Sequence, residues 1–129
     1  EPNIQGVWQG VLTFTAYFDS DSIDFRYVRT HLTFSDSSWQ YYHLKPNGDR
    51  MSLYGCSSEM NRYTVSNDSL RLEDFCFYTG MVDGSIMPGG HYSLELSGER
   101  LLMRASGYNS IMEAELQRSL DLRRISDEI

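Results

Sequence analysis

Apolar and polar residues alternate along the first long stretch of the chain, residues 6–18. Trp8, Leu12 and Phe14 fall on one side of a period-two ribbon, and most residues between them are polar. This alternation predicts a β-strand with one buried face. Such a strand is longer than average and has to bend, and Gly10 is where bending is easiest. We expect the rest of the chain to pair with this strand or pack against its Trp8 face.

Similar patterns recur downstream, separated by short segments rich in Ser, Asn, Asp and Gly. The sharpest turn is Pro46-Asn47-Gly48-Asp49, because proline presets its own φ and Asn-Gly accepts a positive φ. The pattern predicts eight further strands, over residues 23–34, 38–45, 50–54, 60–65, 69–78, 91–96, 100–106 and 111–118.

Two of these stretches are ambiguous. In residues 23–34 the apolar side switches near Tyr27-Val28, which predicts a bulge or a strongly bent strand. Residues 111–118 fit a strand or a helix, and the hairpin-like turn before them favours a strand. The charged tail, residues 119–129, is expected to form a short helical turn or to fray.

Short strands joined by tight turns predict an all-β domain with antiparallel neighbours. The 129 residues fit one domain spanning the whole chain. A twisted sheet of eight or nine strands tends to close, so an up-and-down barrel is the first expectation, with a short C-terminal helix as an optional addition. A two-sheet sandwich is the alternative.

The formal net charge is −7 and the pI is about 4.8. This charge opposes nonspecific binding to nucleic acids or to an anionic membrane surface. The chain has no transmembrane segment, since no apolar run reaches 18 residues, and it has no recognisable signal peptide. Whether a signal or anchor preceded Glu1 stays open.

The two cysteines, Cys56 and Cys76, match no zinc or redox motif. If Val65 and Ser69 flank a turn, the cysteines lie nearly opposite each other at the open end of that hairpin. A disulfide there would close a loop of about 20 residues, worth on the order of 3 kcal/mol, and would favour an oxidising compartment. The alternative is a pair of buried thiols in a cytosolic protein.

Residues 79–90 form the longest loop and combine four of the ten glycines with four apolar side chains. Such a loop either folds over a cavity mouth, presents a partner surface, or tucks its apolar side chains onto the core. The four apolar residues are Met81, Val82, Ile86 and Met87.

No catalytic motif is present, so we expect no enzymatic activity, no metal and no cofactor. His31 and His43 come from consecutive strands and could meet across a hairpin, but a metal site needs a third ligand. The one feature that would favour an enzyme is His43 with a nearby carboxylate.

The opening Gly6-Val7-Trp8 resembles the Gly-X-Trp signature of lipocalins and the wider calycin-like barrels. The turn and strand phrases of residues 45–49, 63–72 and 99–104 are similar to those of bacterial lipocalin-like domains. The resemblance implies that Trp8 closes the barrel base under an arginine from a late strand. Arg118 is the first match for that arginine and Arg104 the second.

The hairpins at residues 46–49 and 66–68 also resemble those of small periplasmic accessory barrels of bacterial membrane-bound regulators, of the ToxS and VtrC type. That resemblance implies a periplasmic or secreted chain, anchored by an upstream segment and paired with a sensor domain, in some cases around a bile salt.

Together, these features predict non-enzymatic binding of a small hydrophobic molecule, such as a lipid, fatty acid or bile salt, inside the barrel. The expected cavity residues are Phe14, Phe34, Tyr42, Met51, Tyr92 and Met103. The alternative is a filled barrel that acts as a protein-interaction module, partner or inhibitor, through Trp39, Tyr41 and the long loop.

Overall fold

The computed structural model describes residues 2–56, 60–75 and 84–127. These residues form nine strands and one 3-10 turn, η1 (Gly84–Ile86). The strands are β1 (Gly6–Phe18), β2 (Ile23–Phe34), β3 (Trp39–Leu44), β4 (Arg50–Cys56), β5 (Arg62–Val65), β6 (Ser69–Glu73), β7 (Gly90–Ser97), β8 (Arg100–Asn109) and β9 (Ala114–Ser126).

All nine strands belong to one antiparallel sheet with the order β4-β3-β2-β1-β9-β8-β7-β6-β5. Neighbours in the sheet are neighbours in the chain, except that β1 pairs with β9. The predicted up-and-down antiparallel architecture is therefore confirmed. Among the described residues, β4 and β5 are the two edges of the sheet, and they do not pair with each other. A single bridge joins Arg62 of β5 to Ser38, the residue before β3, so the sheet is a curled half-barrel.

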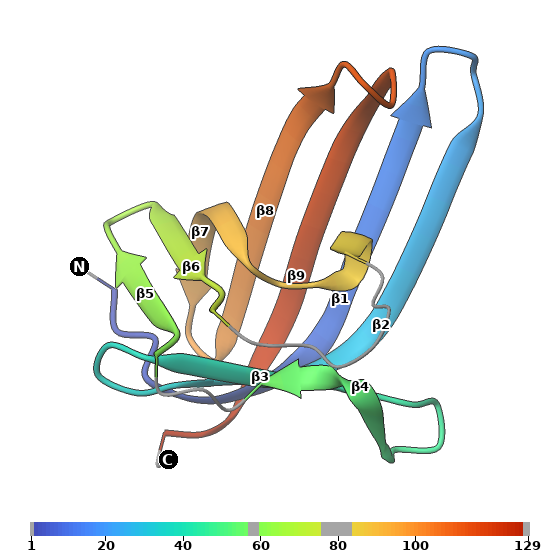
Figure 1. Cartoon of the computed structure of the whole chain (residues 1–129). Coiled ribbons are helices and arrows are strands. Elements are labelled where there is room, and N and C mark those ends of the chain that lie inside the picture. The colour runs from blue at the N-terminus through green and yellow to red at the C-terminus, as the bar shows by residue number, and fades with distance from the viewer. Residues whose placement is uncertain (1, 57–59, 76–83, 128–129) are drawn as a thin grey trace.

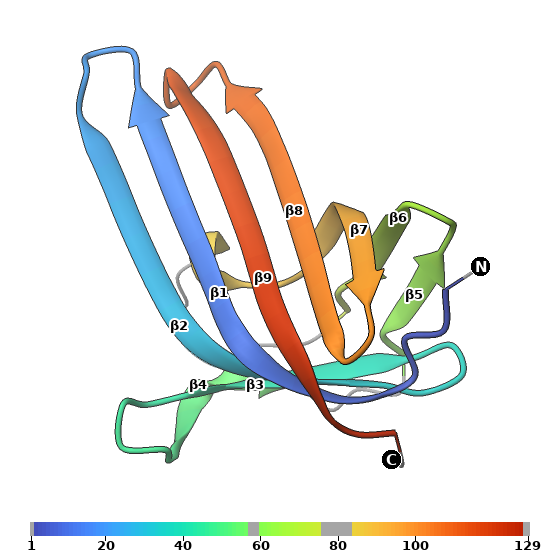
Figure 2. The ribbon, with the colours of Figure 1, turned by 180° about the vertical axis from the view of Figure 1, so that it is seen from behind.

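The sheet has a long half and a curled half. Strands β2, β1, β9 and β8 run side by side, and their two connecting turns lie together at one end (Figures 1 and 2). At the other end the sheet bends, and β3 to β7 wrap round to one side (Figure 1). Residues 84–90 cross in front of the long strands in Figure 1 and lie behind them in Figure 2, so they cover the concave face.

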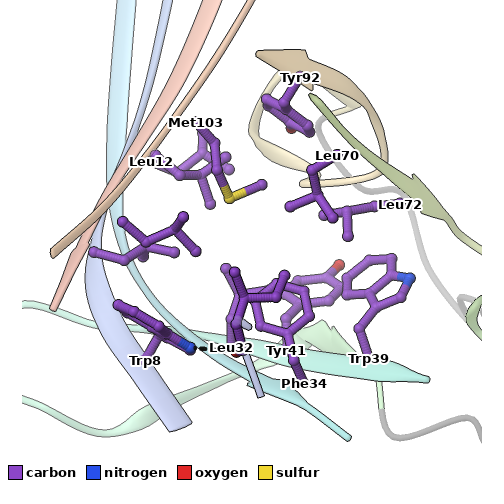
Figure 3. Close-up of a cluster of buried hydrophobic side chains, with 14 of the residues drawn as sticks. Trp8, Leu12, Leu32, Phe34, Trp39, Tyr41, Leu70, Leu72, Tyr92 and Met103 are labelled. Carbon is purple, nitrogen blue, oxygen red and sulfur yellow. Dashed lines mark hydrogen bonds between the residues drawn. The ribbon is translucent and has the colours of Figure 1, made fainter. Parts of the chain in front are cut away.

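The hydrophobic core fills the curled half. Trp8, Leu12 and Leu32, from the two strands at the bend, are completely buried. Figure 3 shows their side chains meeting those of β3, β6, β7 and β8 across the concave side. The side chains that converge there include Phe34, Trp39, Tyr41, Leu70, Leu72, Tyr92, Met103, Leu120 and Leu122. The face of β1 predicted to be buried is thus the face that organises the core.

Strand β2 keeps one continuous register with β1 from Ile23 to Phe34, so the bulge expected near Tyr27-Val28 is absent from this pairing. The apolar side chains before the switch instead point to the outer face, where Ile23, Phe25 and Tyr27 are exposed.

The predicted end of the chain is also corrected. The last strand runs to Ser126, so most of the tail expected to fray or turn is paired with β1 and β8. No α-helix occurs in residues 2–56, 60–75 and 84–127. These residues therefore include no helix long and apolar enough to cross a membrane.

Candidate functional site

An arginine lies across Trp8 at the bend of the sheet, and it is Arg124 rather than Arg118 or Arg104, the two matches that the resemblance implied. The Arg124 guanidinium carbon lies 4.5 Å from the Trp8 ring centroid. Its Nη1 donates to the Gln5 carbonyl at 2.6 Å and its Nη2 to the Asn3 carbonyl at 3.2 Å. The indole Nε1 of Trp8 donates to the Ile4 carbonyl at 2.8 Å, so the two side chains fix the N-terminal segment against the core.

Arg118 lies in a different place, in the middle of the concave face and opposite Phe14 in the β1–β9 register. Its Nε donates to the Ser85 carbonyl and its Nη1 to the Gly89 carbonyl, each at 3.2 Å. Both carbonyls belong to residues 84–90, which we call the strap. Arg118 therefore ties the strap to the long strands.

The strap has two further anchors. The Tyr92 hydroxyl donates to the Pro88 carbonyl at 2.6 Å. His43 Nε2 lies 2.6 Å from the Ile86 carbonyl oxygen and donates to it, since a carbonyl can only accept. The Ile86 side chain packs against the main core. For its described part, the long apolar loop thus tucks onto the core, while Met81 and Val82 lie outside the described residues.

Burial of His43 has an electrostatic consequence. Its side chain is completely buried, and desolvation lowers its pKa to about 4, although the hydrogen bond to Ile86 acts in the opposite direction. His43 is therefore neutral at pH 7. In the register of β2 and β3, His43 faces Thr30 and His31 faces Tyr42, so the two histidines lie on opposite faces of the sheet and do not meet.

The six residues expected to line a cavity separate into three groups. Phe34, Tyr92 and Met103 are buried in the main core, and Met51 packs partly buried against it. Tyr42 is wrongly predicted to point inward, because it lies between the inward residues Tyr41 and His43 and stacks on His31 at the outer face. Phe14 belongs to a second, separate apolar cluster.

This second cluster lies on the concave face of the long strands, beyond the filled core. Phe14, Ala16 and Ala114 are buried there, with Phe18 and Leu116 packed against them. A groove of about 300 Å³ runs beside it. It is lined by Phe14, residues 105–109 of β8, and Leu116, Gln117 and Arg118 of β9, and we call it the concave groove.

The described residues bring together no group of three His, Cys, Asp or Glu side chains that could hold a metal ion. Cys56 lies at the end of β4, whereas Cys76 is outside the described residues, so the disulfide stays a prediction. Comparisons with protein-family models, curated protein sequences and solved structures gave no match to this chain.

Sequence reasoning missed two features of the site. The arginine across Trp8 was missed because the strand carrying Arg124 was expected to end at Arg118. The strap anchors His43 and Arg118 were missed because each joins a strand residue to a backbone carbonyl far away in the chain. Alternating polarity reports which face a residue lies on and says nothing about which carbonyl it meets.

Proposed function

We propose that this protein is a non-enzymatic binding module that holds a small hydrophobic molecule in the concave groove. The observation that carries the proposal is the continuation of the apolar concave face past the filled core, beside Phe14 and Leu116. A volume of about 300 Å³ is at the lower end of the range for small-molecule pockets. The groove therefore suits one slender apolar chain or the edge of a ring system.

The lining of the groove suggests the ligand class. Phe14, Ala105 and Leu116 offer apolar contact, whereas Arg118 and Asn109 offer polar groups at the border. Such a combination fits a molecule with an apolar body and an acidic head group, as in fatty acids and bile salts. Of the six residues expected to line a cavity, this proposal retains Phe14 as a ligand contact.

Kinship with lipocalin-like barrels is part of the same proposal. Its support is the half-barrel order of the strands and the position of Arg124 across Trp8. A periplasmic or secreted location is proposed with it. It rests on the sequence resemblance and on the predicted bridge between Cys56 and Cys76, which a mass shift upon reduction and alkylation tests.

The ligand proposal is tested by calorimetric titration and thermal unfolding with laurate and cholate. We expect saturable binding and a Tm that rises with ligand concentration, because a ligand bound only by the folded state stabilises it. Gly107→Leu fills the groove, since open space surrounds its Cβ position, and should abolish binding. Thr15→Leu makes a comparable change on the outer face and should leave binding intact. If neither laurate nor cholate binds saturably, the proposal is contradicted.

A second candidate is a protein-interaction module. Trp39 and Tyr41, the residues expected to contact the partner, are buried in the core, so they do not support it. It is favoured instead by the edge of the sheet at β5, which in the described part of the chain is bridged only near Arg62 and Tyr63. The Tyr63 amide points away from β6 and donates to the Ser37 carbonyl. Because amide directions alternate along an antiparallel strand, the Val65 amide points to the same open side. An extended segment of another protein could add there as a further strand. We expect a defined partner to co-purify with the wild-type chain and to be lost in Val65→Pro, which removes that amide hydrogen. Equal capture of the partner by both chains contradicts this second candidate.

A further inference from the structure

The outer face of the curled half holds a polar pocket that the concave groove does not touch. Its volume is about 360 Å³, and its walls come from β2, β3 and β4. His31 and Tyr42 are cross-strand partners, and their rings stack with centroids 4.4 Å apart and an interplanar angle of 11°. Thr33, Gln40, Tyr41, Arg50 and Gly55 are the other lining residues in the described part of the chain.

Arg50 is held against the same aromatic ring. Its guanidinium carbon lies 3.7 Å from the Tyr42 ring centroid, a cation–π contact. The register shifts between Tyr42 and Leu44, so that Leu44 pairs with Arg50. The backbone at Gly55 comes so close that a Cβ there would lie 3.1 Å from the Tyr42 Cβ. No carboxylate of the described residues lies within ion-pair distance of Arg50.

Two further arginines lie on the outer face, in the row of paired residues that runs from His31 across the sheet. His31 pairs with Gln9 of β1, and Gln9 pairs with Arg123 of β9. Arg123 in turn pairs with Arg100 of β8, so one row across the sheet carries several basic groups. The carboxylate of Asp121 on this face is engaged by Arg100 through two hydrogen bonds of 3.0 and 2.9 Å. Arg123 therefore adds one exposed positive charge to this face, in a chain whose net charge is −7.

The protonation of His31 responds to the same surroundings. Partial burial and the charge of Arg50 lower its pKa, so the ring is neutral at pH 7. An anion bound in this pocket would favour the protonated ring and raise this pKa again. The positive charge of Arg50 would therefore be balanced, and His31 more readily protonated, when the pocket holds an anion.

We propose that this outer pocket is a binding site for an oxyanion, the carboxylate or phosphate of a small organic molecule. Arg50, in cation–π contact with Tyr42, supplies a planar set of donors suited to two oxygens at once. The His31 ring, the Thr33 hydroxyl and the Gln40 amide supply further donors around it. The volume equals that of about a dozen water molecules at roughly 30 Å³ each, so the ligand is larger than the bare anion.

The test follows the histidine ring signals by NMR during titration with inorganic phosphate and, separately, with benzoate, at constant ionic strength. We expect the His31 signals to shift and saturate, and the His31 pKa to rise. His91 lies on β7, away from this pocket, and serves as an internal reference whose signals should not saturate. Saturation with phosphate assigns a phosphate ligand, and saturation with benzoate assigns a carboxylate; either result supports the site.

Substitutions distinguish specific binding in this pocket from nonspecific attraction of anions to surface arginines. Arg50→Gln should weaken binding about tenfold or more, and Arg50→Lys should also weaken it, because lysine keeps the charge but loses the planar donors. Arg71→Gln removes another exposed arginine, beside Glu73 on β6, and should leave binding unchanged. Equal effects of Arg50→Gln and Arg71→Gln, or an unsaturated His31 response to both anions, would overturn the proposal. Because this pocket and the concave groove lie on opposite faces, loss of one activity leaves the other measurable.

Discussion

At the scale of single residues, Arg124 joins the last strand to Trp8 and to the N-terminal segment. It contacts the Trp8 ring, the carbonyls of Gln5 and Asn3 and the Glu99 carboxylate, and only 14% of its side chain is exposed. Arg124→Lys keeps the charge but loses the flat stacking and the fixed pair of hydrogen bonds. We expect a loss of about 1–3 kcal/mol in the free energy of unfolding, measured by urea denaturation.

The matched control is the neighbouring Arg123, which is exposed on the outer face. Arg123→Lys should change the free energy of unfolding by less than about 0.5 kcal/mol. Equal losses in the two variants would show that the contact with Trp8 contributes nothing specific. The sequence indicated that an arginine lies over Trp8, but its identity depended on where the last strand ends. That end is fixed by pairing with β1, a strand more than a hundred residues away.

At the scale of elements, the bounds of β1 and β2 agree with the sequence prediction residue by residue, because their alternation is long and each ends at a polar turn. Gly10 is better explained by the structure. It was expected to ease a bend, but it also faces the β9 backbone at close range. A Cβ at Gly10 would lie 1.9 Å from the Asp121 carbonyl oxygen and 2.9 Å from the Leu122 Cα.

Gly10→Ala therefore forces the two central strands apart. Both atoms belong to backbone that is paired on its other side with β8, so neither can move away cheaply. We expect a loss of about 3 kcal/mol or more, or failure to fold, measured by urea denaturation and circular dichroism. Gly107→Ala is the control, since open space surrounds that position, and it should be neutral or slightly stabilising. Equal behaviour of the two variants contradicts the close approach of β1 and β9.

At the scale of the whole molecule, the sequence predicted an antiparallel meander correctly but expected it to close. Short polar turns dictate which strands are neighbours, and these signals are local. Closure of the barrel depends instead on whether β4 pairs with β5, and no local sequence pattern predicts that pairing. The filled core shows why an open sheet is sufficient: side chains from both ends of the sheet, such as Trp39 and Leu70, meet across the concave side.

The buried histidine predicts how the stability of the whole fold depends on pH. His43 has a pKa of about 4 in the folded protein, against 6.5 when unfolded, so the unfolded chain binds more protons between these values. Stability is therefore full above about pH 6.5 and is lost as the pH falls towards 4. The shift corresponds to roughly 3 kcal/mol. Asp121, whose pKa is lowered by Arg100, acts in the same direction but only at still lower pH.

Urea denaturation at pH 7 and at pH 4.5 measures this loss. In His43→Gln the amide can still donate to the Ile86 carbonyl but takes up no proton, so its stability should change much less between the two pH values. His31→Gln is the comparison, because the half-exposed His31 ring should account for a smaller share of the pH dependence. If both variants keep the full wild-type loss, the acid sensitivity does not come from the histidines. If His43→Gln alone flattens it, the ring that anchors the strap is also the group through which acid loosens the fold.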